Sequence, residues 1–252
     1  MIKLFSDGAD EYGIMEAARH PKVVGFTTNP SLMRQAGVNN YEQFAKSIIK
    51  ELHSKRPDTN LSLEVFADTM EGMLAQAMVI HSWSQFVLTP DLAGTYPIYV
   101  KIPVTNTRGE STANVVSALS RRGVKCNVTA VFTPQQAEEI LWALDPNTPS
   151  IISVFSGRIA DTGRDAVKRT RDISILRKQS KYINHNVEIL WASSRQAYAY
   201  HEAVEAGCDI ITMPPDLIAK VDKFGKNLEE FSLDTVKMFY KDAVSSGFNI
   251  PV

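Results

Sequence analysis

Two periods of apolar residues alternate along the chain. Short runs rich in β-branched and aromatic residues predict strands, and each is followed by a segment with apolar residues three or four positions apart, which predicts a helix. The predicted strands cover residues 2–7, 23–28, 61–66, 97–104, 124–131, 150–155, 187–192 and 209–213. The predicted helices cover residues 11–19, 41–53, 69–82, 110–122, 133–144, 165–182, 195–205, 216–221 and 233–245.

This series of strands and helices predicts a parallel sheet covered by helices. Eight units without a long linker or a change of composition predict one α/β domain over residues 1–252, a closed (β/α)8 TIM barrel. A C-terminal helix at about residues 232–246 extends the barrel, and we expect it to pack on the barrel or on a neighbouring subunit. The alternative is an open doubly wound sheet, which normally has a glycine-rich turn after its first strand. Residues 6–10 (SDGAD) do not provide one.

The strand predicted at residues 97–104 carries a lysine near its centre. Side chains alternate between the two faces of a strand, so Ile98, Val100 and Ile102 share one face. If that face packs under helices, Lys101 points the other way, where desolvation favours the neutral amine that attacks a carbonyl to form a Schiff base. Taken alone, this strand also allows a simpler interpretation, in which Lys101 extends to solvent at a strand end.

Polar residues recur in the other strands, either in the phase opposite the aliphatic side chains or at the C-terminal end. Each has a structural alternative: Asp7 or Asn29 could cap a turn, and Glu64 could form a purely structural ion pair with Lys101. Together they predict an active site, because the C-terminal ends of barrel strands hold catalytic groups and unpaired interior charges are costly. These candidates are Asp7, Thr27, Asn29, Glu64, Asn127, Thr129, Ser153, Phe155, Arg158, Ser193 and Arg195.

Composition excludes several other classes of function. The 27 Lys and Arg against 28 Asp and Glu give a net charge of −1, so no overall field attracts nucleic acid or membranes. We expect no signal peptide and no transmembrane segment. The two cysteines, Cys126 and Cys208, are isolated, which indicates a reducing cytoplasm. The five histidines form no ligand pair, so we expect no metal site.

With these residues in view, nearly the whole chain resembles the transaldolase family, within the class I Schiff-base aldolases. The segments Thr27-Thr28-Asn29-Pro30-Ser31 and Val100-Lys101-Ile102-Pro103, in this order, are highly specific. The other matching positions are Asp7, Gly25-Phe26, Glu64, Asn127-Val128-Thr129-Ala130-Val131-Phe132, Gly157-Arg158-Ile159 and Ala192-Ser193-Ser194-Arg195.

The resemblance implies a dihydroxyacetone transfer from a ketose phosphate to an aldose phosphate, without a cofactor, in the pentose phosphate pathway. Lys101 would form the Schiff base, Asp7 would take up the hydroxyl proton, and Glu64 and Thr129 would hold a catalytic water. Hydroxyl groups of the dihydroxyacetone unit would be held by Asn29, Asn127 and Ser153. The phosphate would bind to Arg158, Ser193 and Arg195.

Two departures from the family pattern would alter the lining of the substrate mouth. Gly8 stands where a small hydroxyl residue is usual, and Ser194 where an aromatic residue is common. The chain is closest to the small subclass, which implies a homo-oligomer. Glu64 and Phe155 favour transfer over the related fructose 6-phosphate aldolases, which resemble each other in having Gln and Tyr at these positions. A third alternative is a non-catalytic barrel that binds a sugar phosphate, since fold alone does not fix function.

Overall fold

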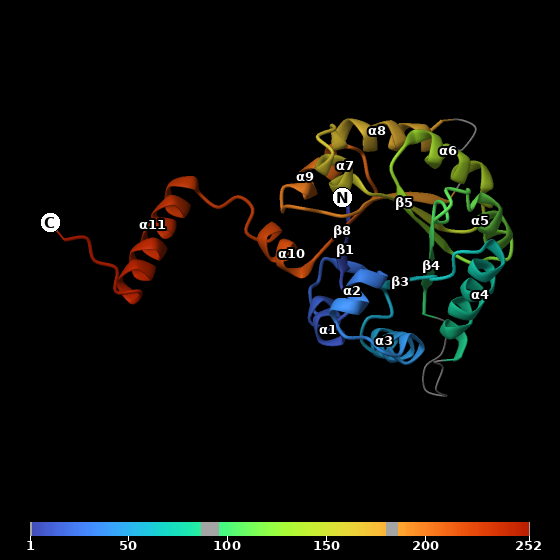
Figure 1. Ribbon diagram of the computed structural model, residues 1–252, viewed down its shortest axis with the longest axis horizontal. Helices are drawn as coiled ribbons and strands as arrows, with labels where there is room; N and C mark the ends of the chain where they lie inside the picture. Colours follow the sequence, from blue (N-terminus) through green and yellow to red (C-terminus); the bar gives the residue numbers. More distant parts are fainter. Residues whose placement is uncertain (1, 87–95, 180–185, 252) are drawn as a thin grey trace.

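Eight parallel strands close into a barrel in the order in which they follow along the chain (Figure 1). The computed structural model describes residues 2–86, 96–179 and 186–251. The strands are Lys3–Asp7 (β1), Val23–Thr27 (β2), Asn60–Glu64 (β3), Ile98–Pro103 (β4), Cys126–Val131 (β5), Ser150–Val154 (β6), Val187–Trp191 (β7) and Ile210–Met213 (β8). Pairing of β1 with β8 closes the ring, which confirms the predicted (β/α)8 barrel and excludes the open sheet.

The helices surround this ring, except the C-terminal helix, which lies apart from it (Figure 1). They are Glu11–Ala18 (α1), Pro30–Gln35 (α2), Tyr41–Lys55 (α3), Met70–Phe86 (α4), Ala113–Ser120 (α5), Pro134–Ala143 (α6), Ser156–Asp161 (α7), Ala166–Arg177 (α8), Ala199–Glu205 (α9), Pro215–Val221 (α10) and Leu228–Ser245 (α11).

Two short helices at strand ends, α2 and α7, were not predicted. Both follow directly on the ends of strands, and α2 begins where the Asn29 side chain accepts a hydrogen bond from the Leu32 amide at 3.0 Å.

Several helices differ in length from the prediction. α5 begins at Ala113, because residues 105–111 fold back on themselves through a bridge between Thr105 and Ser111. α9 begins at Ala199 after a turn, and α11 begins at Leu228, capped by Asn227. α8 ends at Arg177, and residues 180–182 of the predicted helix lie outside the described residues.

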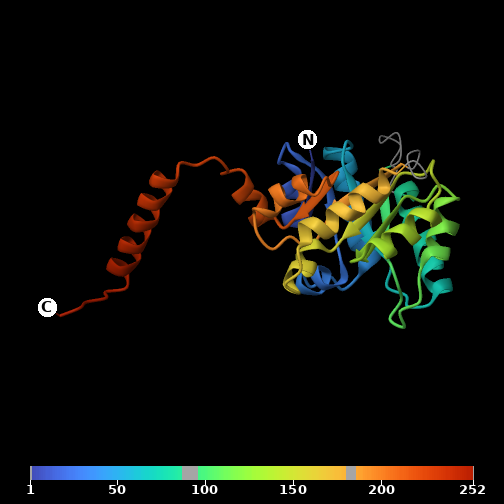
Figure 2. The ribbon, with the colours of Figure 1, turned by 90° about the horizontal axis from the view of Figure 1, so that it is seen from above.

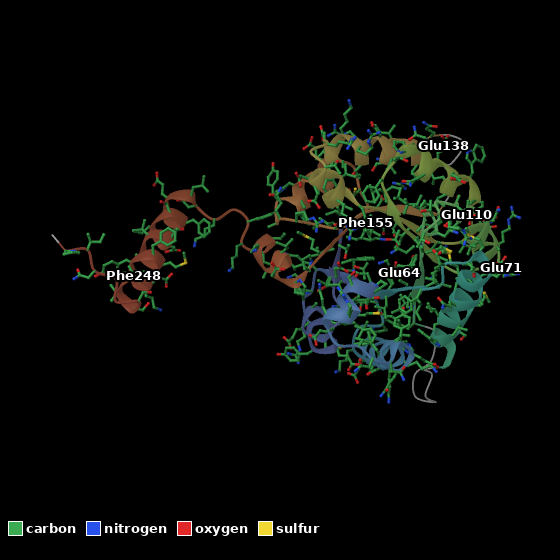
Figure 3. The ribbon with its side chains drawn as sticks, in the orientation of Figure 1. Glu64, Glu71, Glu110, Glu138, Phe155 and Phe248 are labelled. Atoms are coloured by element: carbon green, nitrogen blue, oxygen red, sulfur yellow. The ribbon has the colours of Figure 1, made fainter. Side chains whose placement is uncertain are left out.

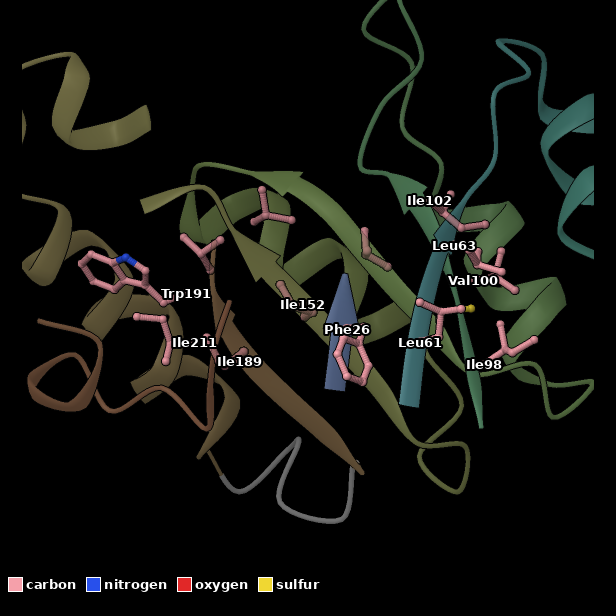
Figure 4. Packing of buried hydrophobic residues seen from close by; sticks show 14 of the residues in the cluster. Phe26, Leu61, Leu63, Ile98, Val100, Ile102, Ile152, Ile189, Trp191 and Ile211 are labelled. Atoms are coloured by element: carbon pink, nitrogen blue, oxygen red, sulfur yellow. The ribbon is translucent and has the colours of Figure 1, made fainter. Parts of the chain in front are cut away.

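The outward faces of the strands form the main core of the molecule. Ile98, Val100 and Ile102 on β4 pack with Leu61 and Leu63 of β3 against the helices (Figure 4). All five are at least 96% buried. The helices therefore fix the phase of each strand, and β4 turns Tyr99 and Lys101 inward, as the alternation predicts.

The last helix lies apart from the barrel in both views (Figures 1 and 2). α11 has no buried residue. Its large apolar side chains stay exposed, including Leu233, Val236, Tyr240 and Val244 at helical spacing. α11 thus forms a C-terminal extension beyond α10. Among the described residues, no helix has both the length and the apolarity needed to cross a membrane.

Candidate active site

A pocket of about 520 Å³ opens at the C-terminal ends of the strands. Glu64 and Phe155, both in its wall, lie inside the ring of helices (Figure 3). Eleven of the twelve sequence-predicted site residues line it: Asp7, Thr27, Asn29, Glu64, Lys101, Thr129, Ser153, Phe155, Arg158, Ser193 and Arg195. Strands, turns and two short helices that are far apart in sequence thus contribute to one cavity, as expected for this end of a barrel.

Lys101 occupies the floor of this pocket and is held from two sides. Its side chain is 7% exposed, and its Nζ lies 3.0 Å from Glu64 Oε2. It also donates a hydrogen bond to the Thr28 carbonyl oxygen at 2.6 Å. Register places Glu64 directly beside Lys101 on neighbouring strands. The pair is largely buried, so neither charge is well solvated. Glu64 is therefore placed to take a proton from the Lys101 ammonium.

Asp7 ends β1 and faces the same space. Thr27, its register partner on β2, donates a hydrogen bond from Oγ1 to Asp7 Oδ1 at 2.8 Å. Burial raises the pKa of Asp7 above its ordinary value of 3.8, while Lys101 and the Thr27 hydrogen bond lower it and Glu64 raises it. A carboxylate whose pKa is moved toward neutral pH is a more effective proton acceptor.

Thr129 faces the pocket next to an irregularity in β5, which brings the neighbouring Ala130 to the pocket wall as well. The pairing with β6 shifts register between Val128 and Val131, and Ala130 adopts a positive φ of 58°. Such a bulge aims a side chain where regular pairing would not. Thr129 Oγ1 is buried and has no hydrogen-bond partner among the residues that the structure describes. A buried hydroxyl of this kind is a site for a bound water or a substrate oxygen.

Asn127 is the predicted site residue that does not line the pocket. It is fully buried one layer below, where its Nδ2 donates to Ser62 Oγ at 3.1 Å. Its Oδ1 accepts a hydrogen bond from Ser153 Oγ at 2.6 Å. Ser153 therefore gives its only hydroxyl proton to Asn127 and presents its oxygen to the cavity as an acceptor. Asn29 lines the pocket as well as capping α2, so the two interpretations of this residue are compatible.

Two exposed guanidinium groups stand at the mouth of the pocket. Arg158 in α7 lies 5.5 Å above the Phe155 ring. Arg195 Nη2 is paired with Asp161 Oδ2. Ser193, between them in the wall, has a positive φ of 65°, and its carbonyl oxygen lies 1.7 Å from where a Cβ on Gly157 would stand. Only glycine fits at position 157, so the strained turn and the start of α7 pack closely.

This arrangement combines a paired amine, two carboxylates and a cationic mouth. The amine and carboxylates lie at the bottom, where they can exchange protons with a bound carbonyl compound. The two arginines lie at the rim, where they can bind a phosphate through paired hydrogen bonds. A molecule with a carbonyl group at one end and an anionic group at the other matches this distribution of charge.

Sequence reasoning missed three residues that shape the site. Thr212 on β8 lines the pocket and hydrogen-bonds to Thr27, and its place in the phase opposite Ile211 and Met213 was the available signal. Ser62 supports Asn127 from below and stood in the same phase as Glu64. Asp161 pairs with Arg195, and no sequence signal indicated it, because the two residues lie 34 positions apart.

The fold and the pocket define a (β/α)8-barrel protein with a polar site at the C-terminal ends of its strands. Within that class, the chain belongs to the family described as Transaldolase/Fructose-6-phosphate aldolase, which matches residues 4–250. The resemblance stated from the sequence is thereby confirmed.

Curated relatives and a solved structure agree with this placement. A "Probable transaldolase" of Caldicellulosiruptor saccharolyticus is 33% identical over 88% of this chain and 90% of the relative. One of Streptococcus equi subsp. zooepidemicus is 34% identical over 87% of the chain and 90% of the relative. The crystal structure of 3-hexulose-6-phosphate synthase from Salmonella typhimurium superposes with a TM-score of 0.51 over 84% of this chain and 89% of that one. At 15% identity, that likeness concerns the fold alone.

Proposed function

We propose that this protein is a transaldolase, which moves a dihydroxyacetone unit from a ketose phosphate to an aldose phosphate through a Schiff base on Lys101. The observation that carries the proposal is the Lys101 side chain, 7% exposed and 3.0 Å from Glu64 at the floor of the pocket. The family membership supports the same reaction class. The proposed donors are fructose 6-phosphate and sedoheptulose 7-phosphate, and the proposed acceptors are erythrose 4-phosphate and glyceraldehyde 3-phosphate.

The first proposed step joins Lys101 to the keto carbon of the donor. The ammonium passes one proton to Glu64, and the free amine attacks the carbonyl to give a carbinolamine. Loss of the former carbonyl oxygen as water, with protons delivered by Glu64, leaves a protonated imine. Thr129 Oγ1, which has no partner among the described residues, supports a water held between Thr129 and Glu64 for these transfers.

The second proposed step breaks a carbon–carbon bond. Asp7 takes the proton of the hydroxyl group on the departing carbon of that bond, so that this hydroxyl becomes the carbonyl of the departing aldehyde. The bonding electrons flow into the imine and leave an enamine on Lys101. Burial, which raises the pKa of Asp7, suits it to this role, and return of the same proton completes the reverse reaction on the acceptor.

The donor would be held at its two ends. Asn29 and Ser153 would contact hydroxyl groups of the three-carbon unit, with Asn127 fixing Ser153 from below. Thr27 would hold Asp7 in place. The phosphate would bind Arg158, Ser193 and Arg195 at the mouth, and Arg195 would then exchange Asp161 for the phosphate or share the two.

Phe155 supports transfer over release of free dihydroxyacetone. Release requires protonation of the enamine carbon and then attack by water. Phe155 lies in the pocket wall beside Ser153, and its phenyl ring provides no proton and helps exclude water. The enamine can therefore wait for an aldehyde acceptor.

The test measures free dihydroxyacetone and transferred product from fructose 6-phosphate, with and without erythrose 4-phosphate. We expect rapid transfer and little release from the wild type. Phe155→Tyr places a phenol beside the enamine and should increase release relative to transfer, and Phe155→Leu is the matched control without a hydroxyl group. If the wild type releases dihydroxyacetone without acceptor as fast as it transfers with one, the protein is an aldolase instead.

The reaction needs no cofactor or metal, since the imine supplies the electron sink. We propose a cytoplasmic location, because the two cysteines are isolated in the sequence. Both cysteines are free and buried in the structure, which is compatible with a reducing compartment.

We further propose that the chain is a homo-oligomer in which α11 packs on a second copy. Leu233, Val236, Tyr240 and Val244 form an apolar stripe on α11, and all are more than half exposed. A helix of this length offers little stability alone in water, so a stripe of this kind indicates a protein partner. Light scattering should show an oligomer that the double substitution Val236→Glu, Tyr240→Glu dissociates, while Lys237→Glu on the same helix leaves it intact. A monomeric wild type would contradict the proposal.

A further inference from the structure

One hydroxyl group in the pocket has no role in the reaction proposed above. Thr212 lies on β8 in phase with Ile210, lines the pocket and is 5% exposed. Its Oγ1 lies 2.6 Å from Thr27 Oγ1, which in turn lies 2.8 Å from Asp7 Oδ1. Three side chains from β8, β2 and β1 thus form one short hydrogen-bonded line that ends on a carboxylate.

The number of protons fixes the direction of this line. A threonine hydroxyl group has one proton to donate, and an ionised carboxylate has none. While Asp7 is ionised, Thr27 gives its proton to Asp7, so the 2.6 Å contact between the two hydroxyl groups requires Thr212 to donate to Thr27. Hydrogen bonds arranged head to tail polarise one another, so this donation strengthens the bond from Thr27 to Asp7.

Thr212 also has contacts outside this chain of hydrogen bonds. Its carbonyl oxygen accepts a hydrogen bond from Ser194 Oγ at 2.9 Å, which ties the end of β8 to the loop after β7. On the other side, its register partner on β1 is Phe5, below Asp7. The backbone that carries this hydroxyl group is therefore fixed by β1 on one side and by the loop after β7 on the other.

We propose that Thr212 is a positioning residue for the proton acceptor of the reaction: it donates to Thr27, and through Thr27 it keeps Asp7 ionised and correctly oriented. The inference rests on the proposed function, in which Asp7 accepts the substrate's proton. The charged groups that face Asp7 are Lys101 on β4, which favours the ionised form, and Glu64 on β3, which opposes it. Neither β2 nor β8 brings a charged side chain to Asp7, so these strands act on it through the two hydroxyl groups.

The test compares Thr212→Val, which keeps the shape and removes the hydroxyl group, with Thr212→Ser, which keeps the hydroxyl group. The first readout is the pKa of Asp7 in the ligand-free protein, followed by carbon-13 NMR of labelled aspartate and assigned by its loss in Asp7→Asn. We expect Thr212→Val to raise this pKa by about half a unit, because Thr27 becomes a weaker donor. Thr212→Ser should leave it near the wild-type value.

The second readout is the pH profile of kcat/KM for the proposed transfer. Because the reaction requires ionised Asp7, a raised pKa moves the acidic limb of the profile to higher pH by the same amount. The matched control is Thr59→Val, which removes another buried threonine hydroxyl group, 2.8 Å from Tyr96 Oη and outside the pocket. It should change neither the pKa of Asp7 nor the acidic limb.

Two results would overturn the inference: an Asp7 pKa unchanged in Thr212→Val, or the same shift in Thr212→Ser as in Thr212→Val. If Thr212→Val does not fold, Thr212→Ala removes the same hydroxyl group with less bulk at the β-carbon and is read in the same way. The NMR titration uses no substrate, so a failure of the proposed function and a failure of this inference give different results.

Discussion

The barrel interior has two layers of side chains. Each strand contributes one residue to the lower layer and the residue two positions further on to the upper layer. In the lower layer, apolar side chains fill most of the space around the buried pair of Ser62 and Asn127, and in the upper layer the next inward residue of the same strand faces the pocket. From lower to upper layer, the pairs are Phe5 and Asp7, Tyr99 and Lys101, Ile151 and Ser153, Leu190 and Ala192, and Ile210 and Thr212.

The two layers satisfy their side chains in different ways. In the lower layer, Phe5 packs so closely over Gly25 that a Cβ there would lie 2.5 Å from its ring. In the upper layer, Lys101, Asp7 and Ser153 are held by hydrogen bonds and an ion pair around an open space. Close packing in the lower layer makes the barrel rigid, and that rigidity fixes the polar groups above it. The difference predicts that substitutions in the upper layer affect catalysis and that substitutions in the lower layer affect stability.

The largest expected effect is loss of turnover in Lys101→Met. The substitution removes the amine that forms the imine, so activity should fall to background while the far-ultraviolet circular dichroism stays native. Because Glu64 then lacks its partner, some stability should be lost. The double variant Lys101→Met, Glu64→Gln removes that unpaired charge and should recover stability without activity. Measurable turnover in either variant would assign the chemistry to another group.

The lower layer should respond in the opposite sense. Phe5 is 1% exposed, and Phe5→Ala should reduce the free energy of unfolding by about 3–5 kcal/mol, because it leaves a cavity in the barrel. Trapping of a ketose phosphate on Lys101 should persist in the fraction that remains folded. Urea denaturation and reductive trapping measure the two properties, and a loss of trapping without a loss of stability would contradict the division between the layers.

At the rim of the upper layer, Arg158→Ala and Arg195→Ala should weaken binding of phosphorylated donors. Loss of one charged hydrogen bond costs about 1.5–3 kcal/mol, which corresponds to an increase in KM of roughly 10- to 150-fold. Unphosphorylated dihydroxyacetone should be affected much less, since it does not reach the rim. Asp161→Asn is the matched control, because it alters the partner of Arg195 and leaves both arginines in place. Equal losses on both substrates would indicate a structural role for the arginines.

The smallest expected effect is a gain of stability in Asp7→Asn. Burial raises the pKa of Asp7 in the folded state above 3.8, so the folded state holds this proton more tightly than the unfolded state does. Wild-type stability should therefore decline as the pH rises through the window that begins near 3.8 and ends at the folded pKa. Asp7→Asn should lack this decline, which amounts to about 1.4 kcal/mol for each unit by which the pKa is raised. Denaturant unfolding between pH 4 and pH 8 measures it, and identical slopes in both proteins would contradict the assignment.

The contrast between the layers also explains what could be predicted from the sequence. Period-two alternation placed Lys101, Glu64 and Thr129 inward, because packing of the opposite face under the helices fixes the phase of each strand. It could not place Asn127 one layer below the pocket, since height in the barrel depends on the stagger of the strands. α2 and α7 were missed because six residues give too little periodicity to separate a short helix from a turn. Thr212 was overlooked because a lone threonine in a strand is common, and only its contact with Thr27 gives it significance.

Reductive trapping tests the central claim most directly, which is that the upper layer performs imine chemistry on one lysine. The protein is incubated with fructose 6-phosphate and borohydride, digested, and the modified peptide is located by mass spectrometry. We predict a single adduct, on Lys101, that is absent from Lys101→Met and unchanged in Lys125→Met, whose lysine lies near the start of β5. An adduct on Lys3 or Lys125 in place of Lys101, or no adduct under conditions of turnover, would contradict the account.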